Sequence, residues 1–253
     1  MNIVKVLITG ASSGIGKSFA YLFADRGYDL VLVARSRDKL EKIKNEINNV
    51  NVDIKVCDLI NIDDCKKLYD ECKDIDILVN NAGFGLVGAF DKTDLDKELN
   101  MIDTNIRSLH ILTKLYLRDM IEKDSGRILN VASIAGFLPG PLMATYYSTK
   151  NYVVTFSESI REELRRKKSK VKISILCPGP VNTNFDKVAN VEFSLNSLSS
   201  DYVADYAIKK FLNGKFYIVP GTTVKFLRFA SKVIPNFILA RFVYLSQKRK
   251  KNV

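Results

Sequence analysis

The sequence predicts an α/β fold, with a doubly wound parallel sheet of about seven strands and helices on both faces. Apolar runs rich in β-branched residues alternate with amphipathic stretches of helical periodicity, and a glycine-rich turn joins the first pair. The expected strands are Ile3–Ile8, Leu30–Val33, Val52–Val56, Ile75–Val79, Arg127–Val131, Val171–Leu176 and Phe216–Val219. The expected helices are Ile15–Arg26, Arg37–Ile47, Asp63–Cys72, Asp94–Glu122, Thr145–Lys167 and Ser200–Leu212.

Length and composition favour one folded unit. The 253 residues are 47% hydrophobic, which suits a single α/β core. The first apolar run is too short for a signal peptide, and no stretch is long and apolar enough to span a bilayer. The four cysteines (Cys57, Cys65, Cys72 and Cys177) form no CxxC pair, so we expect packed, reduced thiols in a cytoplasmic protein. The single histidine lies in an apolar run, and no metal site is expected.

The positive charge is confined to the C-terminal part of the chain. Eleven Lys and Arg and no Asp or Glu lie between Tyr206 and Val253, which accounts for the whole net charge of +11. Nucleic-acid binding would rest on this charge alone, so no nucleic-acid partner is expected.

The turn after the first strand has the pattern of a nucleotide-binding loop. Its glycines permit a tight turn and a close approach of the backbone to a pyrophosphate, and the next helix directs free N–H groups at the phosphates. Its spacing, GxxxGxG, differs from the general dinucleotide fingerprint GxGxxG. The residues expected to bind a cofactor here are Gly10, Ser12, Ser13, Gly14, Ile15 and Gly16.

The end of the second strand indicates NADP(H) rather than NAD. An acidic residue there would bind the ribose 2′-hydroxyl of NAD, whereas this chain has Arg35. The planar fork of donors on Arg35 suits a 2′-phosphate, with Ser12, Ser13 and Arg37 as candidates to assist. The alternative is a solvated arginine in a loop, but the missing acid favours the phosphate.

Further motifs follow in order, from the third strand to the sixth. They are Asp58-Leu59, Asn80-Asn81-Ala82-Gly83, Asn105, Ser133, Tyr146-Tyr147-Ser148-Thr149-Lys150 and Pro178-Gly179-Pro180-Val181-Asn182-Thr183. In this order and at these spacings, the chain from about Ile3 to Val219 resembles the classical short-chain dehydrogenase/reductase family. The resemblance implies a Rossmann-like fold and a nicotinamide-dependent oxidoreductase. Ser13 stands where many NADP-binding members carry Lys or Arg, which leaves Arg35 as the main phosphate ligand.

The expected chemistry centres on Tyr146 and Lys150, which are four residues apart and share one helix face. A free phenol has a pKa of about 10, and a nearby ammonium should lower it. Tyr146 could then donate a proton to a carbonyl oxygen while NADPH delivers hydride to the carbon, and Ser133 would hydrogen-bond the same oxygen. Two alternatives are Tyr147 as the acting tyrosine, and a merely structural pair.

The remaining roles are implied by the family resemblance. Lys150 also holds the nicotinamide ribose, and Asn105 holds a water that relays protons to it. Asp58 contacts adenine and Asn81 lies against the adenosine half. The cofactor contacts expected beyond the glycine-rich turn are Arg35, Asp58, Asn81, Tyr146, Lys150, Val181 and Thr183.

The expected pocket walls, Phe84–Phe90, Ile134–Ala144 and a lid from Asn182 to about Leu198, favour an apolar substrate. Their apolar residues include Phe84, Leu86, Val87, Phe137, Leu138, Leu142, Met143 and Phe185. A fatty acyl, steroid-like or other lipophilic ketone or aldehyde is therefore expected. A sugar-nucleotide epimerase would need a TGxxGxxG turn and a longer substrate domain. A non-catalytic NADPH-binding sensor or scaffold is the other alternative.

Two expectations concern assembly and the C-terminal segment. Apolar positions on two long helices suggest a homodimer or homotetramer, namely Leu109, Leu112, Tyr116, Val153, Phe156 and Ile160. Residues 1–220 should form the catalytic domain, and residues 221–253 a basic amphipathic segment packed on it. In that segment Thr223–Ile234 predicts a helix with Val224, Leu227, Ala230, Val233 and Ile234 on an apolar side, and Lys225, Arg228 and Lys232 in a basic stripe. The segment either covers the pocket or a neighbouring subunit, which is favoured, or lies on an anionic membrane surface.

Overall fold

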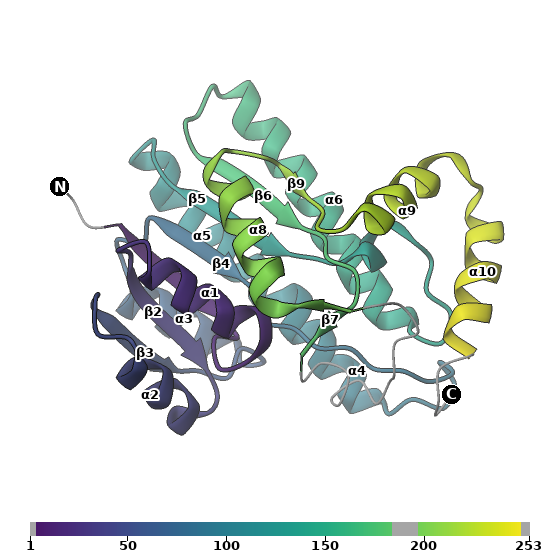
Figure 1. Ribbon diagram of the computed structural model, residues 1–253, viewed down its shortest axis with the longest axis horizontal. Helices are drawn as coiled ribbons and strands as arrows, with labels where there is room; N and C mark the ends of the chain where they lie inside the picture. The colour runs from purple at the N-terminus through teal and green to yellow at the C-terminus, as the bar shows by residue number, and fades with distance from the viewer. Residues whose placement is uncertain (1–3, 184–196, 249–253) are drawn as a thin grey trace.

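A computed structural model describes residues 4–183 and 197–248, with a seven-stranded sheet at its centre (Figure 1). The strand order is β3-β2-β1-β4-β5-β6-β9, and every neighbouring pair is parallel. The strands are β1 (Lys5–Thr9), β2 (Asp29–Ala34), β3 (Val52–Val56), β4 (Ile77–Asn80), β5 (Arg127–Val131), β6 (Lys172–Leu176) and β9 (Tyr217–Ile218). The predicted fold class is therefore confirmed. The order reverses between β1 and β4, which creates a crevice at the carboxyl ends of the strands.

Helices cover both faces of this sheet because side chains alternate along each strand. Val6 and Ile8 pack with α1 (Gly14–Ala24) and α8 (Ser200–Leu212), whereas Leu7 between them packs with α5 (Leu109–Glu122). The other helices are α2 (Arg37–Glu46), α3 (Ile62–Glu71), α4 (Leu95–Ile102), α6 (Ala144–Arg166), α9 (Thr222–Val233) and α10 (Asn236–Lys248), with a short 3-10 helix at Ile134–Phe137. A small parallel pair, β7 (Val181–Asn182) with β8 (Leu198–Ser199), was not predicted.

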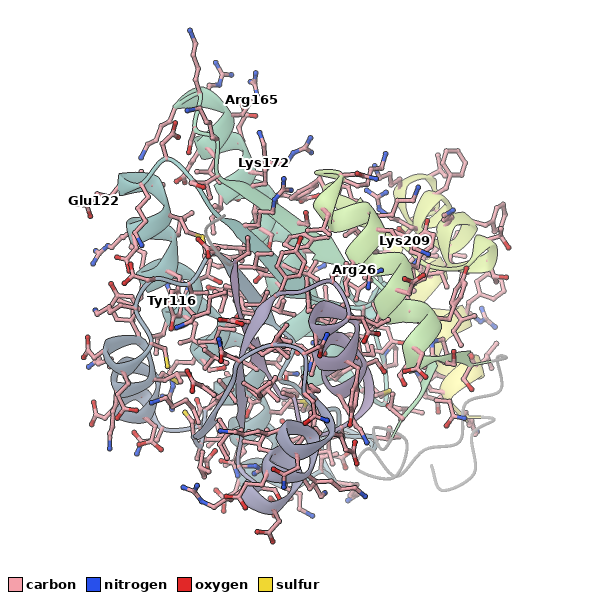
Figure 2. The ribbon with its side chains drawn as sticks, turned by 60° about the vertical axis from the view of Figure 1, so that its left-hand side comes forward. Arg26, Tyr116, Glu122, Arg165, Lys172 and Lys209 are labelled. Carbon is pink, nitrogen blue, oxygen red and sulfur yellow. The ribbon has the colours of Figure 1, made fainter. Side chains whose placement is uncertain are left out.

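The first helical layer is tied together by a surface ion-pair network. Arg26 after α1 contacts the Asp205 carboxylate of α8 at 2.9 Å, and Lys209 contacts the same carboxylate at 2.6 Å. Figure 2 shows Arg26 and Lys209 close together beside α8. All four cysteines are buried and free, as expected of packed thiols.

The helix predicted over Asp94–Glu122 is interrupted by a π-helical segment, Asp103–Ser108, between α4 and α5. The wider turn places the Asn105 side chain on the loop after β4, where its Oδ1 accepts from the Phe84 N–H at 3.1 Å. Its Nδ2 donates back to the Phe84 carbonyl at 2.9 Å. Single π-turns of this kind are commonly found at functional sites.

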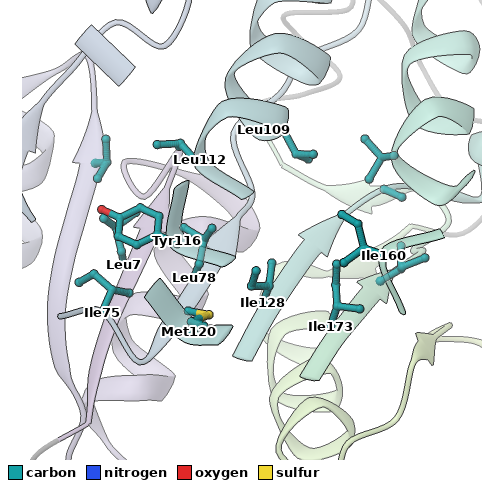
Figure 3. Packing of buried hydrophobic residues seen from close by; sticks show 14 of the residues in the cluster. Leu7, Ile75, Leu78, Leu109, Leu112, Tyr116, Met120, Ile128, Ile160 and Ile173 are labelled. Carbon is teal, nitrogen blue, oxygen red and sulfur yellow. The ribbon is translucent and has the colours of Figure 1, made fainter. Parts of the chain in front are cut away.

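The apolar residues cited for subunit pairing serve another purpose. Leu109, Leu112, Tyr116, Val153 and Ile160 are at most 8% exposed, and Phe156 packs partly buried beside them. Figure 3 shows Leu109, Leu112 and Tyr116 directed at sheet residues such as Leu78 and Ile128. These helices lie over a broad sheet face, and their apolar residues are buried against it. The stated reason for pairing was therefore wrong, although a homodimer or homotetramer stays a prediction that light scattering would test.

The C-terminal residues form two consecutive helices, α9 and α10, at the edge of the molecule opposite the N-terminus (Figure 1). Two details of the predicted amphipathic helix were wrong. Val233 is 68% exposed, whereas Arg228 leaves the basic stripe and stacks 3.5 Å from the centroid of the Tyr217 ring. In the described parts of the chain, no helix is long and apolar enough to cross a membrane.

Candidate active site

A cavity of about 1210 Å³ runs along the carboxyl edge of the sheet, past the residues that follow β1 to β6. It is the crevice in which open α/β sheets bind their ligands. The predicted site residues that line it are Gly10, Ser12, Ser13, Gly14, Ile15, Arg35, Asp58, Asn81, Ser133, Tyr146, Lys150, Val181 and Thr183. Gly16 and Asn105 lie behind the lining. The cavity therefore gathers residues from the whole length of the chain into one place.

The glycine-rich turn closes one end of the cavity. A Cβ on Gly16 would lie 2.3 Å from the Gly10 carbonyl oxygen, so only glycine lets α1 pack this closely under the turn. Ser13, at the N-cap of α1, makes no side-chain capping bond, so no hydroxyl from it blocks the first N–H groups of the helix. Asn81 holds the turn from the neighbouring strand, because its Nδ2 donates to the Thr9 carbonyl at 2.9 Å.

The second strand delivers Arg35 to the same end of the cavity, where its side chain is exposed. Lys39, in the first turn of α2, also lines the cavity and was not predicted. Arg37 points elsewhere, since it pairs with Glu41 at 3.6 Å on the surface. Asp58 accepts a hydrogen bond from the Ile60 N–H at 3.3 Å, in the geometry of a turn cap. Two cations, Arg35 and Lys39, therefore line this end of the cavity.

The centre of the cavity holds Tyr146 and Ser133. Tyr146 is only 9% exposed, and the Ser133 hydroxyl lies close enough to lower the pKa of its hydroxyl. Burial raises the pKa of the Tyr146 hydroxyl well above its usual range, and this outweighs the lowering by Ser133. The expected lowering of this pKa by Lys150 was wrong for this geometry, because burial dominates. The phenol is therefore held protonated, in the form that donates a proton.

Lys150 lies below Tyr146 on the same face of α6. Its Nζ is 5.9 Å from the centroid of the Tyr146 ring and donates to the Val131 carbonyl at 3.0 Å. Burial lowers its pKa to about 8, because the low-dielectric interior disfavours the ammonium. A Cβ on Gly83 would be 3.3 Å from this Nζ and 2.8 Å from Asn105 Oδ1. Gly83 thus lets Lys150 and Asn105 converge under the loop after β4.

Asn105 is almost fully buried, and its side chain is occupied by protein partners. Besides Phe84, its Nδ2 donates to Thr149 Oγ1 at 3.0 Å, and Thr149 in turn donates to the Tyr146 carbonyl at 2.7 Å. This chain of bonds connects the π-helical segment to the first turn of α6. Asn105 therefore fixes the position of the helix that carries Tyr146.

The two adjacent tyrosines have different surroundings. Tyr147 turns away from Ser133, and its hydroxyl accepts a hydrogen bond from Gln247 Nε2 of α10 at 2.9 Å. Burial also raises the pKa of Tyr147. Since Ser133 influences the hydroxyl of Tyr146, whereas the hydroxyl of Tyr147 is bonded to Gln247, the geometry favours Tyr146 over Tyr147 as the acting group.

The far end of the cavity is apolar, but only part of the predicted wall lines it. Phe84, Leu138 and Met143 do so. Leu86 and Val87 pack instead on a small cluster around Met101 and Tyr146, and Leu142 forms a turn whose carbonyl accepts from the Gly88 N–H. Phe185 and most of the predicted lid lie outside the described residues.

Phe137 was wrongly assigned to the wall, because its ring packs 6.1 Å from Tyr217 and 5.2 Å from the Arg228 guanidinium. The C-terminal helices supply the missing wall. The residues of α9 and α10 that line the cavity are Thr223, Leu227, Leu239, Phe242, Val243, Ser246 and Gln247. The segment therefore lines the apolar end of the cavity.

Sequence reasoning missed several residues of the site. Thr149 lies inside the Tyr146–Lys150 motif, and Lys39 follows Arg35 by one helical turn, so spacing could have suggested both. Thr9 accepts from the Asn81 and Ala82 N–H groups at 3.0 Å each, in a bond between neighbouring strands. No local signal marks Gln247, which lies 100 residues from its partner.

The family model for short chain dehydrogenases matches residues 4–192. The chain belongs to the short chain dehydrogenase family. This short chain dehydrogenase is 35% identical over 223 residues to an uncharacterized oxidoreductase of Staphylococcus saprophyticus, with 84% of this chain and 91% of the relative covered. It is 38% identical over 174 residues to the very-long-chain 3-oxoacyl-CoA reductase of Homo sapiens, which covers 64% of this chain and 54% of that reductase. The matched stretch therefore spans about half the length of the human relative.

A solved structure gives the same family. It is a short-chain dehydrogenase from Sphingobium yanoikuyae in complex with NADPH, 29% identical, with a TM-score of 0.81 and coverage of 98% of this chain and 94% of that chain. The present chain is thus an oxidoreductase of the short chain dehydrogenase family.

Proposed function

We propose that this short chain dehydrogenase transfers hydride between NADP(H) and a lipophilic ketone, aldehyde or corresponding alcohol. The observation that carries the proposal is the cavity along the carboxyl edge of the sheet. It has a glycine-rich helix N-terminus and two cations at one end, Tyr146 with Ser133 in the middle, and apolar walls at the other. A cofactor and an apolar carbonyl would meet at Tyr146.

The residues at the nucleotide end fit an NADP molecule. The N-terminus of α1, with no side chain capping it, offers N–H groups and a positive dipole end to a pyrophosphate. Arg35 and Lys39 would hold the 2′-phosphate, the first by a bidentate charge-assisted contact. When bound, the nicotinamide supplies or accepts the hydride. The NADPH complex of the Sphingobium relative supports this choice of cofactor.

The chain's own residues would handle the proton. Tyr146, held protonated by burial, donates to the carbonyl oxygen, and the Ser133 hydroxyl stabilises the charge that develops there. The Lys150 ammonium holds the nicotinamide ribose and leads the replacement proton toward Tyr146. Asn105 serves as a positioning residue through Phe84 and Thr149.

The substrate class follows from the apolar end of the cavity. Phe84, Leu138 and Met143 face Leu227 and Leu239 of the C-terminal helices across a space with no charged wall residue beyond Lys150 among the described ones. The human relative is a very-long-chain 3-oxoacyl-CoA reductase, and this similarity supports a long acyl chain at this end.

The test is NADPH oxidation by the full chain against ketones and 3-oxoacyl thioesters of increasing chain length. We expect kcat/KM to rise with chain length and to be far lower with NADH. Tyr146→Phe, run in parallel, separates enzymatic turnover from background oxidation. Tight NADPH binding without turnover on any carbonyl would contradict the proposal and favour a sensor or scaffold.

A further inference from the structure

The α9–α10 pair presents large apolar side chains to solvent in unusual number. Five of them, Phe226, Phe229, Val233, Phe237 and Phe242, are each 65–76% exposed. Phe226, Phe229 and Val233 are spaced three and four residues apart, so they form one stripe along α9. Folded proteins seldom leave such a contiguous apolar stripe bare without a binding role.

This exposed stripe is not an unfinished part of the core. The opposite side of α9 already packs on the body through Val224, which is 8% exposed, and through Arg228, whose guanidinium lies on the rings of Tyr217 and Phe137. Gln247 anchors α10 to Tyr147 in the same way. Each helix thus has one face committed to the enzyme and another left outside.

The charge on the pair has a single sign. Lys225, Lys232, Arg241 and Lys248 are exposed between the apolar residues, and neither α9 nor α10 contains Asp or Glu. Three more basic residues, at positions 249–251, follow in the sequence. Phenylalanine interleaved with lysine and arginine is the composition of helices that lie in an anionic lipid surface.

We propose that the outer surface of α9 and α10 docks the enzyme peripherally on an anionic membrane. The Phe side chains would enter the boundary between headgroups and acyl chains, while the cations contact lipid phosphates. Neither helix is long and apolar enough to cross a bilayer, so the contact lies in the plane of the interface. The positive charge of the α9–α10 surface complements the negative charge of an anionic membrane, which is why we assign this partner to it.

A second copy of the chain fits this surface less well. Symmetric pairing brings the same patch of each copy together, which would place the cations of two α9–α10 pairs face to face. The remainder of the chain has no net charge to offer, because residues 206–253 hold the whole excess of +11. An anionic lipid surface satisfies both the phenylalanines and the lysines.

The docking surface is continuous with the cavity. Phe242 is 65% exposed and also lines the cavity, and Leu227 and Val243 line it from the same two helices. If the substrate is lipophilic, which rests on the proposed function, it can pass from the bilayer into the site along these residues. The docking itself stands without that function, since it is measured by binding and not by turnover.

The test is cosedimentation of the full-length protein with sucrose-loaded vesicles of pure phosphatidylcholine or of phosphatidylcholine with phosphatidylserine. We expect pelleting only with the anionic vesicles, reversed by high salt. Replacing Phe226, Phe229 and Phe237 by Ser should lower the partition coefficient by more than tenfold. Lys225→Gln and Lys232→Gln should each lower it by about fivefold at low salt.

Matched controls lie on other helices. Leu95→Ser with Leu99→Ser removes exposed apolar side chains from α4, and Lys42→Gln with Lys44→Gln removes exposed cations from α2. Both double variants should bind vesicles within about twofold of wild type. An unchanged thermal midpoint with NADPH would show that each variant is folded.

Three outcomes would overturn the proposal. One is absence of pelleting with anionic vesicles, and another is equal loss of binding in the α4 or α2 controls. The third is a dimer in light scattering that the triple Phe variant converts to monomer, since that would assign the surface to a second copy. Loss of turnover with intact pelleting would count against the proposed function alone.

Discussion

The cofactor end of the cavity and the α9–α10 pair are held in place by different means. At the cofactor end, backbone and side chains of neighbouring strands bond each other directly, as Asn81 does with Thr9, and these bonds are partly buried at the sheet edge. The α9–α10 pair depends on a few long side chains, chiefly Arg228 and Gln247, and leaves much of its apolar surface exposed. This difference teaches that the rigidly held cofactor end can position the reacting groups, while the exposed α9–α10 pair is free to determine which substrate binds.

The largest expected effect tests the rigid end. Tyr146→Phe removes the transferable proton and keeps the ring, so reduction should fall by about 10²–10⁴-fold with NADPH affinity nearly unchanged. Steady-state kinetics and NADPH fluorescence titration would measure the two quantities. Tyr147→Phe is the matched control, because the Tyr147 hydroxyl is bonded to Gln247. This substitution should lower turnover only slightly. An equal loss in both variants would contradict the assignment.

The next effect concerns the choice of cofactor. Arg35→Ala removes a charge-assisted contact of about 2 kcal/mol, so the Kd for NADPH should rise by about thirtyfold while the Kd for NADH stays within about twofold. Isothermal titration would measure both. Arg37→Ala is the control, since Arg37 pairs with Glu41 away from the cavity. Equal affinities of the wild-type protein for the two cofactors would refute the NADP assignment.

A pH effect of intermediate size follows from Lys150. Because burial lowers its pKa to about 8, the ammonium that would hold the cofactor is lost as the pH rises through this value. The kcat/KM for NADPH should therefore fall by about tenfold per pH unit above about 8 and level off below it. A profile that stays flat to pH 9.5 would show that Lys150 keeps its proton in the free enzyme.

The smallest effect tests the exposed end. Gln247→Leu leaves the Tyr147 hydroxyl without its partner and should cost about 1 kcal/mol, a fall of about 2–4 °C in Tm. KM for long-chain carbonyls should rise while kcat for a small carbonyl stays the same, because α10 lines only the substrate end. A double-mutant cycle with Tyr147→Phe should give a coupling near this value, and purely additive effects would contradict the contact.

The sequence pattern was sufficient to predict those functional residues that lie where a strand or helix begins or ends. The parallel sheet followed from β-branched runs, and the glycine-rich turn, Arg35 and the Tyr146–Lys150 pair followed from spacing, because each lies where one strand or helix begins or ends. The structure brings these residues into one cavity.

The sequence pattern did not predict contacts between residues that lie far apart in the chain. Helical periodicity placed Arg228 in a solvated stripe, since it carries no information about the Tyr217 and Phe137 rings that receive it. It also assigned both Val233 and Val224 to one apolar side. In the structure α9 has two apolar sides, a buried one with Val224 and an exposed one with Val233. The raised pKa of Tyr146 could not be foreseen, because burial depends on residues packed from several elements.

The π-helical segment at Asp103–Ser108 has a consequence for engineering the chain. A π-turn holds one residue more than an α-helical turn, so deleting Thr104 would allow a regular α-helix through this segment. The buried and exposed faces of α4 and α5 would stay as they are. The deletion would swing Asn105 away from Phe84 and Thr149 without removing any side chain that bonds them. It offers a way to uncouple the loop after β4 from α6 by changing the length of the backbone alone.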